Sequence, residues 1–188
     1  YLAGVTLAKQ FTPDADAVVG VPDSGLPAAE GYAAQSGIPY CNGLVKNRYI
    51  GRTFIQPTQD MREGAVRLKL SPLKNEIEGK RLVLVDDSIV RGTTMRRIIA
   101  MLRRAGVKEI HLAITSPPFR YACYYGTDVP DESQLPANRY TIEQMRDMLG
   151  ADSLTFLDVN RLEETIPCCS RALCKACFDG CYPMPPKN

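Results

Sequence analysis

Short runs of consecutive apolar residues recur along the chain and predict the strands of a sheet. The clearest is Arg81-Leu82-Val83-Leu84-Val85-Asp86, in which no polar residue interrupts the apolar stretch. Unbroken runs of this length are typical of strands buried on both faces, as in parallel sheets. The strands expected on this ground cover residues 17–21, 38–45, 81–86, 110–114 and 154–157.

Amphipathic stretches between these runs predict helices. Met95, Ile98, Ile99 and Leu102 recur at i, i+3, i+4 and i+7, the spacing of one helix face. A strand, a helix and a strand in this order form a βαβ unit, whose crossover is right-handed. The chain is therefore expected to be an α/β domain. The expected helices cover residues 26–36, 95–105, 141–149 and 159–166, the third of them opened by a capping box of Thr141 and Gln144.

Length and charge narrow the class of protein. The chain has 188 residues, enough for one α/β domain with a short appendage. Its net charge of +2 gives no reason to expect nucleic acid or a membrane as partner. No apolar run approaches the roughly 18 to 20 residues that span a bilayer. The chain begins Tyr1-Leu2-Ala3-Gly4, without a secretory signal or an initiator Met, so we expect a fragment or a processed product.

The residues that end and follow the run 81–86 carry the strongest candidate chemistry. Asp86 and Asp87 stand at the carboxyl end of a buried strand, where open α/β sheets bind ligands. A turn rich in hydroxyls then leads into a helix N-terminus, where free N–H groups favour an anion. A ribose phosphate could place its hydroxyls on the carboxylates and its phosphate in this turn. The alternative is a solvated Asp pair before an ordinary helix cap. The turn is Ser88-Ile89-Val90-Arg91-Gly92-Thr93-Thr94.

Two further stretches fit a phosphate ligand. Pro22-Asp23-Ser24-Gly25 follows the first strand, and Ser24 near a helix start can present a hydroxyl and N–H groups to pyrophosphate, although such a turn is also common elsewhere. Residues 46–70 predict a long basic loop, whose mobile cations could close over phosphate groups. A solvated basic face or an RNA-binding patch would have the same charge. The cations of the loop are Lys46, Arg48, Arg52, Arg62, Arg67 and Lys69, against the acids Asp60 and Glu63.

Together these stretches resemble the glutamine phosphoribosylpyrophosphate (PRPP) amidotransferases. The matching motifs are Val-Pro-Asp-Ser-Gly at 21–25, Lys-Asn-Arg-Tyr-Ile-Gly-Arg-Thr-Phe-Ile-Gln-Pro at 46–57 and Leu-Val-Asp-Asp-Ser-Ile-Val-Arg-Gly-Thr-Thr at 84–94. The likeness runs from about residue 14 to residue 183. It implies a type I phosphoribosyltransferase fold, with a mostly parallel, twisted sheet and helices on both faces.

The resemblance also implies residue roles. Asp86 and Asp87 would hold the ribose hydroxyls and influence Mg²⁺, and Ser24 would contribute to the magnesium–pyrophosphate site. Lys46 would belong to the flexible loop that closes over PRPP. The candidate catalytic residues are thus Asp86, Asp87 and Lys46, and the candidate Mg²⁺ residues are Ser24, Asp86 and Asp87. The 5′-phosphate would be held by Ser88, Ile89, Val90, Arg91, Gly92, Thr93 and Thr94.

The reaction implied by the resemblance is the first step of de novo purine synthesis. Ammonia displaces pyrophosphate at the anomeric carbon of PRPP and gives 5-phosphoribosylamine. The glutaminase half that supplies ammonia lies upstream in the family and is absent here, so we expect this chain to use free ammonia at best. The family further implies purine nucleotides as feedback inhibitors, a homo-oligomer and a cytoplasmic location.

Two other functions remain open. A phosphoribosyltransferase for a purine base or orotate would share the motif at 84–94 but would not need the stretch 46–57 or a cysteine-rich tail. A non-catalytic regulator that senses PRPP should carry a DNA-binding module, for which this chain has no room.

The seven cysteines are unevenly spread and divide the chain into a phosphoribosyltransferase domain, residues 1–166, and a cysteine-rich tail, residues 167–188. The spacing of Cys174 and Cys177 allows zinc, a redox dithiol or an iron–sulfur cluster. The resemblance to the iron–sulfur branch of the family implies a 4Fe-4S cluster on Cys123, Cys174 and Cys177. The fourth ligand in the family lies upstream of the region covered here. Candidate substitutes, none of them assigned by the motif, are Cys168, Cys169 and Cys181.

Overall fold

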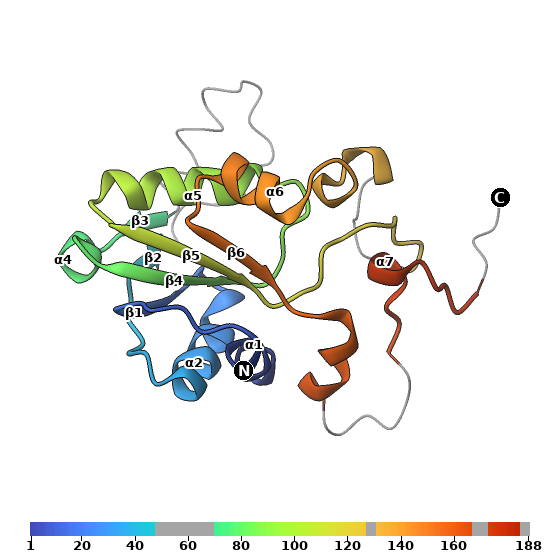
Figure 1. Ribbon diagram of the computed structural model, residues 1–188, viewed down its shortest axis with the longest axis horizontal. Coiled ribbons are helices and arrows are strands. Elements are labelled where there is room, and N and C mark those ends of the chain that lie inside the picture. Colours follow the sequence, from blue (N-terminus) through green and yellow to red (C-terminus); the bar gives the residue numbers. More distant parts are fainter. Residues whose placement is uncertain (48–69, 127–130, 167–172, 185–188) are drawn as a thin grey trace.

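Four parallel strands form the central sheet of the computed structural model, which describes residues 1–47, 70–126, 131–166 and 173–184 (Figure 1). The strands lie in the order β1-β4-β5-β6, and every neighbouring pair is parallel. The predicted strand at 81–86 is confirmed residue for residue. The strands are β1 (Ala17–Gly20), β4 (Arg81–Asp86), β5 (Glu109–Ile114) and β6 (Ser153–Phe156).

Helices cover both faces of this sheet, which confirms the expected α/β class (Figure 1). Val18, Val83 and Val85 belong to one buried cluster with the first two helices, whereas their neighbours Leu82 and Leu84 belong to another cluster with α5 and α6. Successive side chains of a strand point to opposite faces, so both faces of the sheet are apolar. The helices are α1 (Leu2–Gln10), α2 (Gly25–Ser36), α5 (Thr93–Arg104) and α6 (Ile142–Leu149).

The helix boundaries follow local signals. The capping box of α6 is confirmed, because the Thr141 hydroxyl accepts from the Gln144 N–H at 3.2 Å and the Gln144 side chain accepts from the Thr141 N–H at 2.9 Å. Helix α2 ends at Gly37, whose φ of 75° lies in the left-handed region that favours glycine. Helix α5 begins at Thr93, two residues before the apolar pattern that predicts it.

Helix α1 was not predicted from the sequence. Its buried positions include Gly4, Thr6 and Ala8, so the pattern of large apolar residues that indicates a helix face is missing. Its backbone instead lies directly against α2. A Cβ atom at Gly4 would lie 1.8 Å from the carbonyl oxygen of Ala28, a distance that no side chain tolerates.

The predicted strand at 38–45 is only partly correct. Tyr40 forms an isolated parallel bridge with Val18, and residues 44–46 form β2 (Leu44–Lys46), which pairs with β3 (Leu70–Pro72) in a separate antiparallel ribbon. The segment around Tyr40 therefore lies beside β1, on the side away from β4. The helix expected at 159–166 is a 3₁₀ helix, η4 (Val159–Thr165). The other short helices are α4 (Lys74–Ile77), η2 (Glu132–Gln134), η3 (Pro136–Asn138) and α7 (Ala176–Asp179).

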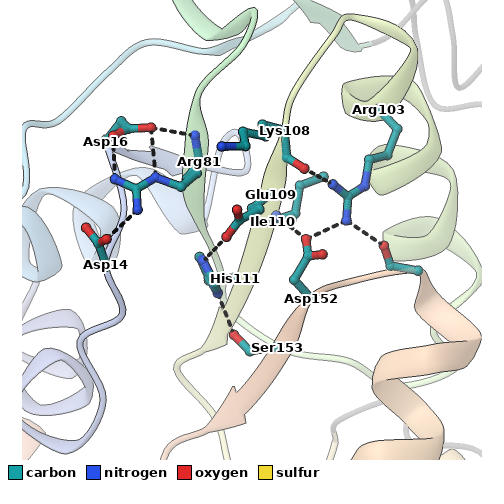
Figure 2. A network of polar contacts seen from close by, with 11 residues as sticks. Asp14, Asp16, Arg81, Arg103, Lys108, Glu109, Ile110, His111, Asp152 and Ser153 are labelled. Atoms are coloured by element: carbon teal, nitrogen blue, oxygen red, sulfur yellow. Dashed lines mark hydrogen bonds and ion pairs between the residues drawn. The ribbon is translucent and has the colours of Figure 1, made fainter.

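Ion pairs tie the strands together at their amino ends (Figure 2). The Arg81 guanidinium at the start of β4 pairs with Asp14 and with Asp16, the latter at 2.8 Å. The Asp16 carboxylate also accepts from the Arg81 backbone N–H at 2.8 Å. Hydrogen bonds from Arg81 lower the pKa of Asp16 to about 2. The link between α1 and β1 is thereby fixed to β4.

A second set of contacts at the same edge involves Arg103 of α5 (Figure 2). Arg103 donates to the carbonyl of Lys108 at 2.6 Å and pairs with Asp152, which also accepts from the Ile110 N–H at 2.6 Å. His111, the one histidine, lies here with its Nδ1 3.0 Å from the Ser153 hydroxyl. None of the described helices is long and apolar enough to cross a membrane.

Candidate active site

Two turns meet at the carboxyl ends of β1 and β4. The chain leaves β1 through residues 22–25 (the β1 turn) into α2 on one face, and leaves β4 through residues 87–92 (the β4 turn) into α5 on the other face (Figure 1). Because neighbouring strands send their connections to opposite faces here, this is the switch point at which open α/β sheets bind ligands. The sequence motifs at 21–25 and 84–94 are thus adjacent in space.

Asp86 is the last residue of β4 and is partly buried, whereas Asp87 is exposed. The pKa of Asp86 is raised to about 7, mainly by burial and in smaller part by the charge of Asp87. A hydrogen bond from the Asp87 N–H at 2.9 Å lowers this pKa in part. The Asp86 carbonyl accepts from the Thr115 N–H at 3.0 Å. This bond fixes the end of β4 to the residue that follows β5. Bound hydroxyl donors or a cation would stabilise the charged form of this carboxylate.

The β4 turn presents a helix N-terminus without a capping side chain. Gly92 occupies the N-cap position of α5 with a φ of 77°, a conformation that glycine adopts without strain. Thr93 and Thr94 are exposed on the first helical turn, and the Ser88 hydroxyl lies 3.5 Å from the Asp87 carboxylate. Unpaired N–H groups and hydroxyls at the start of a twelve-residue helix suit a phosphate group.

The β1 turn lies against the end of β4 because Gly25 has no side chain. A Cβ atom at Gly25 would lie 2.7 Å from the carbonyl oxygen of Val85 and 3.3 Å from the Cα of Asp86. The Pro22–Asp23 peptide bond is cis. Ser24, exposed at the N-cap position of α2, therefore sits beside the Asp86 end of β4, where it was predicted to act.

Lys46 reaches the site from the antiparallel ribbon. It is the last residue of β2, and its ammonium forms an ion pair with the Asp23 carboxylate of the β1 turn. Most of the predicted basic loop, from Arg48 to Lys69, lies outside the described residues.

The side-chain atoms at the switch point that could ligate a metal ion are oxygens. The carboxylates of Asp86 and Asp87 and the hydroxyl of Ser24 suit Mg²⁺, which proteins often bind through one or two carboxylates together with substrate phosphates. Within the described ranges, no group of three or more His, Cys, Asp or Glu side chains is placed to hold a metal ion. A magnesium site here would therefore be completed by the ligand's own phosphates.

The described part of the cysteine-rich tail, residues 173–184, folds back onto residues 119–126. The Cys177 carbonyl accepts from the Arg120 N–H at 3.0 Å and from the Tyr121 N–H at 3.1 Å. Burial raises the pKa of Cys177 to about 11, and the nearby thiols of Cys123 and Cys174 contribute to the rise. The charges of both other predicted ligands thus influence Cys177, although among the described residues these three thiols are not placed to hold a single metal ion. Cys41 lies apart, half-buried with its sulfur 3.7 Å from the Glu76 carbonyl.

Two contacts of the site were not predicted from the sequence. Asp23 belongs to a recognised motif, but its pairing with Lys46 depends on how the ribbon folds back. Val90 of the β4 turn packs against the buried pair Phe119 and Leu135, as do Cys123 and Cys177. The β4 turn and the cysteine-rich tail therefore share one small apolar cluster. No periodicity in the sequence indicates either contact.

Comparison with known proteins fits this geometry. Residues 5–120 match the family described as phosphoribosyl transferase domain. Amidophosphoribosyltransferase of Bacillus subtilis is 51% identical over 96% of this chain, and amidophosphoribosyltransferase 1, chloroplastic, of Arabidopsis thaliana is 48% identical over 99%. The chain covers 39% and 33% of these relatives, respectively.

Solved structures agree with the sequence matches. Glutamine PRPP amidotransferase from B. subtilis, complexed with ADP and GMP, superimposes with a TM-score of 0.86 at 50% identity. The match covers 97% of this chain and 41% of that protein. An adenine phosphoribosyltransferase from Giardia lamblia, at 17% identity and a TM-score of 0.51, shares the fold alone.

Proposed function

The chain belongs to the phosphoribosyl transferase domain family, and from this membership we propose that it is the PRPP-binding part of an amidophosphoribosyltransferase. The observation that carries the proposal is the meeting of the β1 turn, the Asp86–Asp87 pair and Lys46 at the switch point of the sheet. The identity of about half the residues to whole-chain amidophosphoribosyltransferases supports this acceptor chemistry over a base or orotate.

Each part of the site has a proposed role toward PRPP. Asp86 and Asp87 accept hydrogen bonds from the two ribose hydroxyls, which orients the sugar ring. The β4 turn and the N-terminus of α5 bind the 5′-phosphate, with the backbone and hydroxyls of residues 88–94 as donors. Ser24 and the β1 turn bind the pyrophosphate group, and Lys46 offsets its charge.

The reaction needs no covalent enzyme intermediate. A bond forms from the ammonia nitrogen to the anomeric carbon while the bond from that carbon to pyrophosphate breaks, and the nitrogen then loses a proton to solvent. The protein's part is to hold the ring and to stabilise the charge that gathers on the leaving group. Mg²⁺, when bound by Ser24, Asp86 and Asp87, would supply further positive charge to that group.

Pyrophosphate release from PRPP and Mg²⁺ tests this function. We expect the purified chain to release pyrophosphate when ammonia is present, and not when adenine, guanine or orotate replaces it. We expect glutamine as the sole nitrogen source to give no product with residues 1–188 alone, which cover 39% of the B. subtilis relative. Turnover with a base would instead indicate a base phosphoribosyltransferase. Binding of PRPP without turnover under any acceptor would indicate the sensing function.

We further propose that Cys123, Cys174 and Cys177 ligate a 4Fe-4S cluster. Each ligand of such a cluster binds a different iron, so the thiols surround a volume larger than one ion. The apolar cluster that Cys177 shares with Cys123, and the influence of the Cys123 and Cys174 thiols on the pKa of Cys177, support a common group at this place. Burial disfavours the thiolate of Cys177, and a bound cation would stabilise it. Zinc on the same thiols is the alternative.

Metal analysis of cysteine variants distinguishes a 4Fe-4S cluster from a zinc site. We expect the anaerobically purified chain to contain iron and to show the broad visible absorption of an iron–sulfur cluster. Cys177→Ala should reduce the bound iron to background, while the matched variant Cys41→Ala, away from the tail, should retain it. Stoichiometric zinc in place of iron would contradict the cluster. Unchanged iron in Cys177→Ala would exclude that residue as a ligand.

The remaining partners are also proposals. The ADP and GMP bound by the B. subtilis structure support purine nucleotides as inhibitors of this chain's whole protein. We propose a homo-oligomer, an upstream glutaminase domain as the ammonia source, and a cytoplasmic location. The plant relatives are chloroplastic. None of the five cysteines among the described residues takes part in a disulfide.

A further inference from the structure

The ion pair between Asp23 and Lys46 places a carboxylate where the proposed function puts an anion. Asp23 belongs to the β1 turn and directly precedes Ser24, the residue proposed to contact pyrophosphate. Its side chain is 54% exposed, whereas that of Lys46 is 29% exposed. A negative group at this position repels a pyrophosphate and weakens its binding. The proposed roles of Ser24 and Lys46 do not account for it.

The ion pair gives the Asp23 carboxylate a role if Lys46 has to be held in place when no ligand is bound. Lys46 ends β2, and its long, flexible side chain would otherwise sample many conformations. Asp23 draws the ammonium onto the β1 turn, within reach of the groups that would contact pyrophosphate. The exposed carboxylate can turn into solvent when another anion arrives. Ion pairs with such exposure contribute little stability, so this one can be exchanged.

We propose that Asp23 is the counterion that Lys46 exchanges for the pyrophosphate group of the ligand. In the free protein Asp23 positions Lys46, and on binding the phosphate oxygens take its place. The exchange weakens the affinity for pyrophosphate and for PRPP, and after the reaction Asp23 recaptures Lys46, which speeds release of the product. The inference rests on the proposed function and assigns Asp23 a positioning role.

A metal-binding role for Asp23 would have the opposite consequence. If the carboxylate held Mg²⁺, its removal would weaken binding in the presence of the metal and have no favourable effect without it. The ammonium of Lys46 already neutralises the carboxylate and disfavours a second cation there. Titration of pyrophosphate alone, without Mg²⁺, therefore separates the two roles.

Calorimetric titration of pyrophosphate into four proteins tests the exchange. The proteins are the starting chain, Asp23→Asn, Lys46→Met and the double variant. Asp23→Asn keeps the shape of the side chain and removes its charge, so we expect pyrophosphate to bind about three- to tenfold more tightly. KM for PRPP should fall in the same variant, and pyrophosphate should inhibit turnover at lower concentration. In the Lys46→Met background the gain should be clearly smaller, because only the direct repulsion between the carboxylate and pyrophosphate is then removed.

The control is Asp14→Asn, which removes a carboxylate paired with Arg81 at the opposite edge of the sheet. It changes the net charge equally and should leave pyrophosphate affinity within twofold of the starting chain, about the scatter of the titration. If the starting chain does not bind pyrophosphate, the proposed function fails. If it binds but Asp23→Asn binds equally or more weakly, the exchange is refuted. A gain of equal size in the Lys46→Met background refutes it as well.

Discussion

Replacing Asp86 with Asn is expected to lower kcat/KM for the ammonia-dependent reaction by about 10²- to 10³-fold, the loss typical of removing one group that stabilises a developing charge. The amide cannot supply the negative charge that is proposed to hold a ribose hydroxyl and Mg²⁺ together. It can still accept the hydrogen bond from the Asp87 N–H, so the end of β4 should keep its conformation. Turnover should be measured at saturating Mg²⁺, with Asp87→Asn as a companion variant.

The same substitution is expected to stabilise the fold at neutral and higher pH. The folded-state pKa of Asp86 is about 7, above the value of about 3.9 in an unfolded chain. Between these values the native state binds more protons than the unfolded state, so the cost of ionising Asp86 grows as pH rises. Above pH 7 the full cost remains. Three pKa units correspond to ~4 kcal/mol, and the partial exposure of Asp86 reduces the expected gain to about 2 kcal/mol.

Urea denaturation at two pH values checks the sign of this effect. Asp86→Asn should exceed the starting chain in unfolding free energy at about pH 8. The difference should shrink toward about pH 4, where Asp86 is protonated in the native state and about half protonated in the unfolded chain. Asp147→Asn removes an exposed carboxylate of α6 and serves as the control, with a change within about 0.5 kcal/mol. A pH-independent difference would contradict the assigned pKa.

The second large effect is expected from Gly25→Ala. One added methyl group would lie 2.7 Å from the Val85 carbonyl oxygen, so the β1 turn would have to move away from the end of β4. Alanine favours a helix over glycine by up to ~1 kcal/mol. Overpacking against backbone costs about 1–3 kcal/mol and should exceed that gain, since neither backbone segment can rotate out of the contact.

We therefore expect Gly25→Ala to lose about 1–2 kcal/mol of unfolding free energy and at least tenfold in pyrophosphate affinity. The affinity loss follows because Ser24 would no longer lie beside Asp86. Calorimetric titration and urea denaturation measure the two quantities. Glu30→Ala, an exposed change on the same helix, should alter neither. Unchanged affinity in Gly25→Ala would show that the closeness of the two turns does not matter for binding.

The parts of the fold that could be predicted are those fixed by local sequence. The run 81–86 is apolar on both faces, and α5 follows from the spacing of Met95, Ile98, Ile99 and Leu102. Helix α1 could not be found this way, because its contact with α2 depends on the absence of a side chain at Gly4. The strand expected at 38–45 pairs in part with β1 and in part with β3. Such long-range pairing cannot be inferred from a hydrophobic pattern.

The candidate site divides in the same way. Asp86, Asp87 and Ser24 could be predicted because each follows a recognisable strand. The approach of the two turns depends on the order of the strands in the sheet, which the motifs do not encode. The ion pair between Lys46 and Asp23 joins residues 23 positions apart, and it forms only because the β2–β3 ribbon folds back toward the β1 turn. The magnesium and iron–sulfur roles stay predictions, as does the closing of the basic loop.

The network of Arg81 and Arg103 lies at the amino ends of the strands, where substitutions can change stability without altering the ligand site. Arg81 lies at the opposite end of β4 from Asp86, about 17 Å away for five residue steps along the strand. Substitutions separated by such distances act nearly independently on stability. Variants that strengthen the amino edge could therefore offset destabilising changes at the switch point without altering ligand contacts. Laboratory evolution toward a new acceptor could begin with substitutions that stabilise the amino ends of the strands, because these ends do not contact the acceptor.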